Sequence, residues 1–584
     1  MNYNKTIEEA TALSPSAKTA ILQWLTEEKY TEYRPELEQL IDAQDWKTLE
    51  DRFFMTIPFG TGGRRGAVGI GSNRINNVTI GESAQGFATY LLSQIGEDVK
   101  RQGIVIAHDT RTTSRAFAEY AAGIFAANEI KTYLFESFRA TPELSFAVRF
   151  LEAAGGVVIS ASHNPPADNG FKAYWSDGGQ IIPPHDKGII NAVMNVQALP
   201  SVDGLNGVIM IDSHIDNAYI TAVANESLSQ SRSATIVYSP LHGTGTMSAQ
   251  KVLEHAGFSD LTVVQEQATP DGTFPNLPNN IPNPEVPSAS EMVTQYAQRL
   301  QADIAITTDP DADRLGVVAQ DADGQYKLLT GNQIAALAAW YVANKGEKGF
   351  MVRTIVTTDM LDAIAEDFGL KIYNHILIGF KYVAQLIREH QDNGDEIFLF
   401  GGEESYGMLK GSYCRDKDAA VAALLLCELA SELKDQGKTL LGQLDELYKK
   451  YGVYTETLAN IQYPGAEGFK NMQNIMRQLR EHPLTEISGR SITAIIDREK
   501  FEGTEKGNVL IFELSPHPAA AGPRQQAAAR LTIRPSGTEP KIKIYAQLHA
   551  PVSQEISNEE LQQKKSEELT RAKELTDAFQ KLIA

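Results

Sequence analysis

Three aspartates alternate with small residues in one short stretch: Asp309, Asp311 and Asp313. Carboxylates this close together repel one another unless a cation lies among them, and an oxygen-only ligand set suits a hard cation such as Mg²⁺. A calcium-binding EF-hand does not fit, because its sixth position should be glycine and is Arg314, and its twelfth should be glutamate and is Gln320. The stretch therefore predicts a magnesium site; an aspartyl nucleophile at Asp309 and a solvated acidic turn are the alternatives.

A second polar loop, here called the serine loop, follows an apolar run and reads Ala161-Ser162-His163-Asn164-Pro165. In a turn stiffened by proline, the Ser162 hydroxyl could act as a nucleophile or carry a phosphoryl group. Lys172 lies ten residues after Ser162, and the chain could bring its cationic side chain back next to the serine loop. An ordinary turn is the alternative, because the loop does not match the Gly-x-Ser-x-Gly elbow of hydrolases.

Two further loops combine arginine with glycine. Residues 534–538 (Arg534-Pro535-Ser536-Gly537-Thr538) offer the guanidinium fork, hydroxyls and open backbone N–H groups that a phosphate dianion requires. Residues 59–66 (Phe59-Gly60-Thr61-Gly62-Gly63-Arg64-Arg65-Gly66) offer a second set of glycines and guanidinium groups. Taken singly, each loop could be a glycine turn with a surface arginine.

Three more polar residues are candidates for ligand contacts. Glu403 and Ser405 are separated by one residue in a loop after an apolar run, and they could bind sugar hydroxyls. Lys381 follows Ile378-Gly379-Phe380 and is a candidate cation, with a surface lysine after a turn as the alternative.

The composition limits the classes of partner. The chain has 584 residues and a net charge of −21, with 42% hydrophobic and 22% charged residues, which suits several globular domains. An acidic chain is a poor general binder of nucleic acid or of an anionic membrane, so we expect neither partner. Two cysteines exclude a disulfide framework, and no apolar run approaches the ~18 residues of a membrane span. We therefore expect a cytoplasmic protein.

Strands must hold these loops in place. From about Phe53 onward, short apolar runs alternate with helical patterns, which favours α/β layers, whereas the first fifty residues have helical spacing throughout. Ligands in open α/β sheets bind beyond the carboxyl ends of strands, so three polar loops after three strands predict one cleft built from several domains.

Residues 270–287, rich in proline and asparagine, are expected to be a loop, and Ser557 and Glu560 predict the capping box of a terminal helix. We expect a helical extension at residues 1–50 and domains at residues 51–212, 213–325, 326–452 and 453–584.

Together, these five loops resemble, in order, the motifs of the α-D-phosphohexomutase family, which contains phosphoglucomutases and phosphomannomutases. Residues 161–165 resemble its phosphoserine loop, and residues 59–66 its first arginine loop, with Arg65 the better match to the functional arginine. The resemblance implies an α/β fold: three related mixed-sheet α/β domains and a C-terminal α+β domain around a central cleft. Pro310 and Ala312 depart from the pattern, since many members carry glycine there. The remaining matches are residues 309–314 to the metal loop, 402–405 to the sugar loop and 534–538 to the phosphate clamp.

The resemblance also implies the reaction. It predicts an isomerase that interconverts glucose 1-phosphate and glucose 6-phosphate through a phosphoserine at Ser162 and glucose 1,6-bisphosphate, which also serves as primer. One Mg²⁺ per chain would be held by phosphorylated Ser162 and the three aspartates. His163 or Lys172 would be the general base, and Arg65 would assist catalysis. The substrate would contact Arg314, Lys381, Glu403, Ser405, Arg534, Ser536, Gly537 and Thr538.

Glucose is the expected sugar, because residues 402–405 resemble the glucose-preferring form of the sugar loop. A phosphopentomutase is one alternative, because the long N-terminal segment and residues 59–63 resemble the longer branch of the family, which includes phosphopentomutases. A phosphomannomutase is another. A phosphomonoesterase and a non-catalytic sugar-phosphate sensor are further alternatives. We expect a monomer or a weak homo-oligomer.

Overall fold

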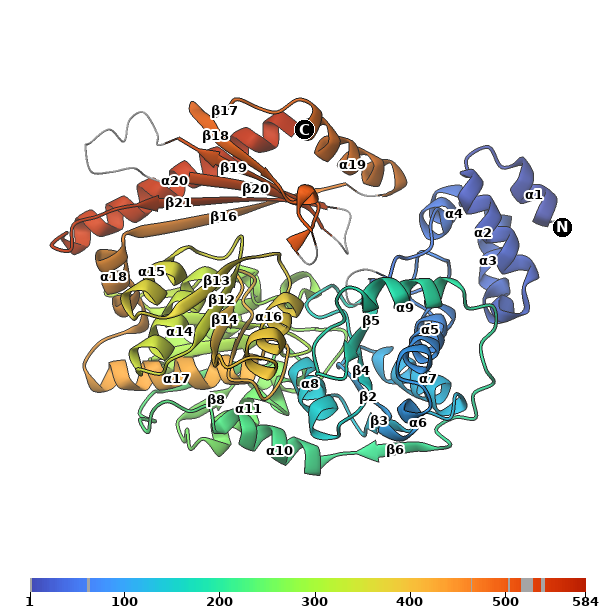
Figure 1. Cartoon of the computed structure of the whole chain (residues 1–584), viewed down its shortest axis with the longest axis horizontal. Coiled ribbons are helices and arrows are strands. Elements are labelled where there is room, and N and C mark those ends of the chain that lie inside the picture. The colour runs from blue at the N-terminus through green and yellow to red at the C-terminus, as the bar shows by residue number, and fades with distance from the viewer. Residues whose placement is uncertain are drawn as a thin grey trace.

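The computed structural model describes residues 3–59, 63–463, 465–502, 505–515, 529–536 and 541–583. Figure 1 shows a helical unit, then three α/β domains, then a fourth domain built on an antiparallel sheet. In that view the fourth domain lies above the third, and the helical unit lies beside the first. The architecture is the one expected from the resemblance.

The N-terminal helical unit has a core of its own. Its central ring, Trp24, stacks on Tyr30 at 4.3 Å and meets Phe53 edge-on at 5.4 Å. Ile70 and Val78 of the first domain belong to the same core, so the unit packs onto that domain as an appendage. Its helices are α1 (Tyr3–Glu9), α2 (Pro15–Thr26), η1 (Glu28–Tyr33), α3 (Arg34–Asp42) and α4 (Trp46–Phe53).

The first domain holds a six-stranded sheet in the order β1-β5-β4-β2-β3-β6. Every residue of its central strand β2 is buried, and alternate residues belong to two separate cores: Ile104 and Ile106 to one, Val105 to the other. A parallel strand buried on both faces reads as a continuous apolar run, as it does here. The strands are β1 (Gly63–Ala67), β2 (Ile104–His108), β3 (Thr132–Phe135), β4 (Gly155–Ile159), β5 (Asp168–Trp175) and β6 (Val208–Ile211). The helices are α5 (Asn77–Ile95), α6 (Asp98–Gln102), α7 (Ser114–Ala127), α8 (Thr141–Phe150) and α9 (His185–Met194).

The second and third domains repeat this plan, with parallel strands at the centre and an antiparallel strand at one side. Their sheets have the orders β11-β10-β9-β7-β8 and β13-β12-β14-β15. The second sheet extends past residue 325, where we expected its domain to end. Its elements are β7 (Ile236–Ser239), β8 (Leu261–Val263), β9 (Ile304–Thr308), β10 (Leu315–Gln320) and β11 (Tyr326–Leu328), with α10 (Ser213–Ala224), α11 (Ala249–His255), α12 (Gln265–Ala268) and α13 (Glu291–Leu300). Those of the third are β12 (Phe350–Thr354), β13 (Lys371–Ile376), β14 (Phe398–Gly402) and β15 (Met408–Lys410), with α14 (Gly331–Asn344), α15 (Met360–Asp367), α16 (Phe380–Ile387), α17 (Ala419–Asp435) and α18 (Leu440–Tyr451).

The fourth domain is an antiparallel sheet in the order β16-β21-β20-β19-β18-β17, and two helices share its core. Its strands are β16 (Val453–Gln462), β17 (Glu486–Ile487), β18 (Arg490–Asp497), β19 (Leu510–Leu514), β20 (Ala529–Pro535) and β21 (Lys541–Ala550). Its helices are α19 (Gly465–Glu481) and α20 (Asn558–Ile583).

Several smaller predictions can be compared with this structure. Ser557 and Glu560 exchange the hydrogen bonds of a capping box before α20, as predicted. Residues 270–287 form a loop with short 3-10 turns, also as predicted. Ile397 lies just before β14 and is 60% exposed, so the apolar run there is not buried along its whole length. Within the described parts of the chain, no helix is long and apolar enough to cross a membrane.

One local device occurs in each α/β domain: a buried strand runs into a polar loop and returns as an antiparallel neighbour. The serine loop lies between β4 and β5, residues 309–314 join β9 to β10, and residues 403–407 join β14 to β15. Each loop has one non-glycine residue in the left-handed region: Ser162 (φ 53°), Ala312 (φ 51°) and Tyr406 (φ 68°). Such conformations cost about 1–3 kcal/mol and persist only where the surroundings enforce them. Ala312 therefore occupies a backbone conformation that itself favours glycine.

We predict that Phe53→Ala destabilises the helical unit by about 3–5 kcal/mol, because it empties a fully buried ring site beside Trp24. Hydrogen exchange of residues 3–53 should become faster, and thermal unfolding should begin at a lower temperature. Phe150→Ala is the control, because Phe150 is 43% exposed and its removal should change both readings far less. Unchanged exchange in the Phe53 variant would mean that this core does not hold the unit.

Candidate active site

The polar loops of the α/β domains and the fourth domain meet at one cleft. It has two compartments, of about 230 Å³ and about 600 Å³, and both are lined by Arg65, Arg314, Arg534 and Lys543. The smaller compartment is also lined by Ser162, Lys172, Asp313, Glu403 and Ser405, and the larger by His163 and Ser536. The fold thus brings sequence-predicted residues from all four domains to one place.

Ser162 is 1% exposed, and its hydroxyl donates a hydrogen bond to Asp309 Oδ2 at 2.6 Å. His163 Nδ1 lies 3.2 Å from the same hydroxyl. Burial, together with the guanidinium groups of Arg314 and Arg65, holds the pKa of His163 well below its usual value. The imidazole is therefore neutral.

The three predicted metal ligands converge. Asp309, Asp311 and Asp313 are buried, and each offers a carboxylate oxygen within 4.8 Å of the others. Burial and the two neighbouring carboxylates raise the pKa of Asp309 well above its usual value. The Oδ1 atoms of Asp311 and Asp313 have no hydrogen-bond partner among the described residues. Buried carboxylate oxygens left unsatisfied around one point fit a hard divalent cation such as Mg²⁺.

Two lysines offset part of this negative charge. Lys172, on β5, pairs with Asp311, and Lys417 Nζ lies 2.7 Å from Asp313 Oδ2. Burial would raise the pKa of Asp311, but the Lys172 ammonium outweighs it and the pKa falls below its usual value. Burial would likewise lower the pKa of Lys417, but Asp313 and Asp416 raise it. Lys417 therefore stays charged beside Asp313.

Two residues near the metal loop were missed by the sequence analysis. Lys417 is one of four consecutive charged residues, Arg415 to Asp418, that follow the sugar loop after β15. Such a run next to a ligand loop was an available signal. Glu285, from the loop 270–287, pairs with Arg314 at the end of the metal loop, and no local pattern in the sequence pointed to it.

The sugar loop lies at the same cleft. Glu403 Oε1 accepts a hydrogen bond from the Gly379 backbone N–H at 3.0 Å. Burial raises the pKa of Glu403 to about 7, although Lys417 opposes the shift. Lys381 is the exception, because it lines neither compartment of the cleft: its ammonium is buried over the Tyr382 ring, and burial lowers its pKa to about 8.

The fourth domain contributes cations from two adjacent strands. Arg534, on β20, donates to the Tyr545 hydroxyl at 3.3 Å. Lys543 lies opposite Arg534 on β21, and burial together with the Arg534 guanidinium lowers the pKa of Lys543 to about 8. The sequence analysis missed Lys543, because a lysine in an alternating strand is usually solvated. Gly537 and Thr538 lie outside the described residues.

Arg65, on β1, faces the serine loop. Its Nη1 donates to Asn164 Oδ1 at 3.4 Å, and its side chain lines both compartments. Of the predicted residues that the structure describes, only Lys381 is absent from both the cleft lining and the aspartate cluster.

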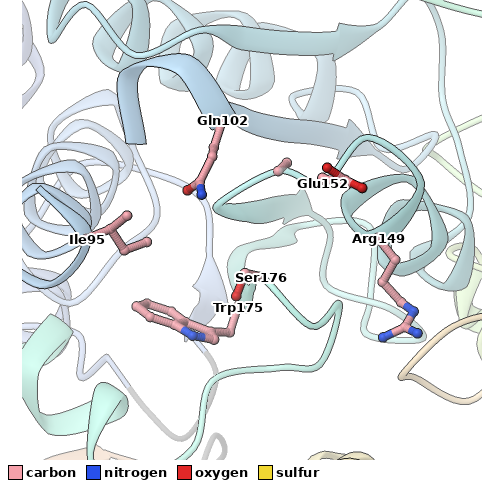
Figure 2. A pocket seen from close by; sticks show the side chains of 7 residues that line it. Ile95, Gln102, Arg149, Glu152, Trp175 and Ser176 are labelled. Carbon is pink, nitrogen blue, oxygen red and sulfur yellow. The ribbon is translucent and has the colours of Figure 1, made fainter. Parts of the chain in front are cut away.

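A second cavity lies on the first domain, apart from the cleft (Figure 2). It measures about 500 Å³, and no sequence-predicted site residue lines it. Trp175, the last residue of β5 and beyond Lys172 on that strand, forms one wall. Its lining residues are Ile95, Gln102, Arg149, Glu152, Ala153, Trp175 and Ser176.

Comparison with known proteins decides the family. The chain matches the domain family described as "Phosphoglucomutase/phosphomannomutase, alpha/beta/alpha domain I" over residues 56–199, the corresponding domain II over residues 217–324 and domain III over residues 330–451. This chain belongs to the α-D-phosphohexomutase family. A phosphoglucomutase of Staphylococcus epidermidis is 35% identical over 506 residues, which cover 84% of this chain and 91% of the relative. A phosphoglucomutase of Staphylococcus aureus is 33% identical over 538 residues, which cover 88% and 93%.

Solved structures of phosphohexomutases share the fold. A phosphoglucomutase/phosphomannomutase family protein of Burkholderia thailandensis aligns with a TM-score of 0.62 at 17% identity, over 89% of this chain and 97% of that one. The Paramecium phosphoprotein parafusin, a phosphoglucomutase crystallised in an open form, aligns with a TM-score of 0.64 at 15% identity, over 90% and 98%. At these identities the likeness concerns the fold alone.

We predict that kcat/KM for a phosphosugar falls as the pH rises through about 8, because Lys543 then loses the proton that lets it attract phosphate. The loss should reach about tenfold by about pH 9, the value of one charge-assisted hydrogen bond. Lys543→Arg should remove this limb of the profile, because a guanidinium stays charged. An arginine variant with the same limb would assign the pH dependence to another group.

Proposed function

We propose that this chain interconverts glucose 1-phosphate and glucose 6-phosphate as a phosphoglucomutase, with Ser162 as the phosphoryl carrier. The observation that carries the proposal is the Ser162 hydroxyl, buried 2.6 Å from Asp309 in a cleft with cations from all four domains. The names of the curated relatives support the same reaction.

Asp309, Asp311 and Asp313, together with a phosphoryl group on Ser162, would hold one Mg²⁺. When bound, this ion would neutralise charge on the phosphoryl group and so favour its transfer. The donor set is all oxygen and fully buried, which suits that ion.

The residues of the chain then have separate tasks. Arg534, Ser536 and Lys543 hold the phosphate of the incoming sugar phosphate, which leaves its free hydroxyl facing Ser162. Glu403 and Ser405 bind the sugar hydroxyls. These positions favour transfer by orientation and charge, which is how phosphoryl-transfer enzymes act in general.

Phosphoryl transfer proceeds in two half-reactions. The sugar hydroxyl attacks the phosphorus on Ser162, and its proton goes to the neutral His163 imidazole or to Lys172 in its neutral amine form. The bond between Ser162 Oγ and phosphorus breaks as the new ester forms, and Ser162 Oγ takes up that proton from the base, which gives glucose 1,6-bisphosphate. The bisphosphate then turns over in the cleft. The Ser162 hydroxyl attacks the phosphorus of its other phosphate, the bond from that phosphorus to the sugar oxygen breaks, and the Ser162 proton passes through the same base to the sugar oxygen, which releases glucose 6-phosphate. Glucose 1,6-bisphosphate added from outside would prime a dephosphorylated enzyme in the same way.

The cations shared by both compartments suit this reorientation. The two compartments share Arg65, Arg314, Arg534 and Lys543, so a cation faces the sugar's phosphate in either orientation. Water must stay out while phosphorylated Ser162 waits, because hydrolysis is the competing reaction. Release of inorganic phosphate without isomerisation would instead identify a phosphomonoesterase.

We predict that Ser162→Ala lowers kcat by about 10³-fold or more, because the covalent step is lost. Mass spectrometry of the wild-type protein should find one phosphoryl group on the peptide that contains Ser162. Ser83→Ala is the matched control: Ser83 is also fully buried, but it bonds to the Thr79 carbonyl within α5. Full activity in the Ser162 variant would exclude the phosphoserine route.

We predict that Asp311→Asn weakens Mg²⁺ binding by about 100-fold or more, measured by titration calorimetry, because it removes a charged oxygen donor from a buried cluster. Chelation should stop turnover in the wild type, and Mg²⁺ should restore it. Asp321→Asn is the control, since Asp321 lies in an acidic turn next to Asp323 outside the cleft. Equal Mg²⁺ affinity in both variants would place the metal elsewhere.

A further inference from the structure

Arg111, between β2 and α7, is buried beneath the serine loop and 2% exposed. Its guanidinium uses all five of its N–H groups. Four of them donate to backbone carbonyls of the serine loop and the start of β5, among them Ser162 O at 2.6 Å and Pro165 O at 2.6 Å. The fifth, on Nε, donates to Asp109 Oδ2 at 3.1 Å.

Asp109 supports Ser162 on its backbone N–H side, through the Ser160 hydroxyl. Its Oδ2 accepts the Ser160 hydroxyl at 2.7 Å, and that hydroxyl in turn accepts the Ser162 backbone N–H at 2.8 Å. The Asp109–Arg111 pair therefore holds the backbone N–H of Ser162 through Ser160 and its carbonyl directly. This is the restraint that a serine at φ 53° requires, since no glycine relieves the strain.

The second domain completes this support. The Phe274 ring, fully buried, lies 5.3 Å from the Arg111 guanidinium. Gly272 approaches the backbone of Arg111 so closely that a β-carbon would overlap it. At the other end of the same loop, Glu285 pairs with Arg314 of the metal loop. We call residues 270–287 the strap, because they connect the support of the serine loop to the metal loop.

We propose that Arg111 is a positioning residue, and that with Asp109 and the strap it fixes Ser162 Oγ in register with Asp309 and the bound sugar phosphate. The proposal rests on the proposed role of Ser162 as phosphoryl carrier. The proposal also gives the strap a function in positioning Ser162, whereas the sequence analysis predicted only that this segment is a loop. A guanidinium can serve four carbonyls and a carboxylate at once, whereas a lysine has three donors at a single point.

A purely structural arginine of the same kind provides the control. Arg232 donates to the carbonyls of Ser229, Ser231 and Ala256, and pairs with a carboxylate, Glu428, at 3.1 Å. Its guanidinium lies 4.7 Å from a phenylalanine ring, that of Phe258. It belongs to the second domain and does not line the cleft.

The test compares Arg111→Lys with Arg232→Lys. For Arg111→Lys we expect kcat to fall about 10- to 100-fold, because small misplacement of a reacting group has effects of this size. KM should stay within about twofold, because sugar-phosphate contacts are untouched. Hydrolysis of phosphorylated Ser162, followed by mass spectrometry, should also become faster. Arg232→Lys should lower the melting temperature but leave kcat and the hydrolysis rate unchanged.

Several results would overturn the proposal. An unchanged kcat in a folded Arg111→Lys variant would do so, as would an equal loss of kcat in Arg232→Lys. If Arg111→Lys does not fold, Phe274→Leu provides the test, because it keeps an apolar side chain but removes the ring that contacts Arg111. A fall in kcat at constant KM in that variant supports the proposal. An unchanged kcat overturns it. A wild-type enzyme that is active without phosphorylated Ser162 would refute the proposed function itself, and with it the role of Arg111.

Discussion

The requirement that governs this structure is charge balance around three buried carboxylates. Asp309, Asp311 and Asp313 each bring an oxygen within 4.8 Å of the others, and two unit charges about 4 Å apart repel by about 4 kcal/mol even at an effective dielectric of about 20. The metal loop cannot supply the compensation alone, so Lys172 comes from the first domain and Lys417 from the third. The cleft is therefore built where the domains bring their charges together.

Backbone geometry solves the related problem of holding polar side chains at the cleft on a rigid support. Each α/β domain turns a buried strand back on itself through a polar loop, with one strained residue at Ser162, Ala312 or Tyr406. Loops between adjacent strands are held at both ends by the sheet, so their side chains can be placed without a flexible arm. The fourth domain lacks the parallel plan and contributes two cations, Arg534 and Lys543, to the cleft from β20 and β21 instead.

Local patterns in the sequence predicted the polar loops and the family, but not the distant charged residues that lie next to these loops. The metal triad, the serine loop and the family were predicted because each depends on residue type and local spacing, and the family is confirmed by the matched domains and by relatives at 33–35% identity. Lys417 and Lys543 were missed because a lysine near a turn or in an alternating strand usually faces solvent. Lys381 was predicted to contact substrate, but its side chain is buried over Tyr382, and neither compartment of the cleft includes it.

The sequence by itself determined which elements form, because buried strands, helical stripes and capping residues are properties of a few consecutive side chains. It also predicted which loops gather polar side chains, because residue type and spacing show that directly. Only the tertiary structure decided which charges meet: Ser162 and Asp309 are 147 residues apart, and Lys172 and Asp311 are 139 apart. It likewise decided that Arg111 holds the serine loop and that the strap holds Arg111. The physical reason is that an ion pair or hydrogen bond depends on distance in space, which domain packing sets and local sequence does not encode.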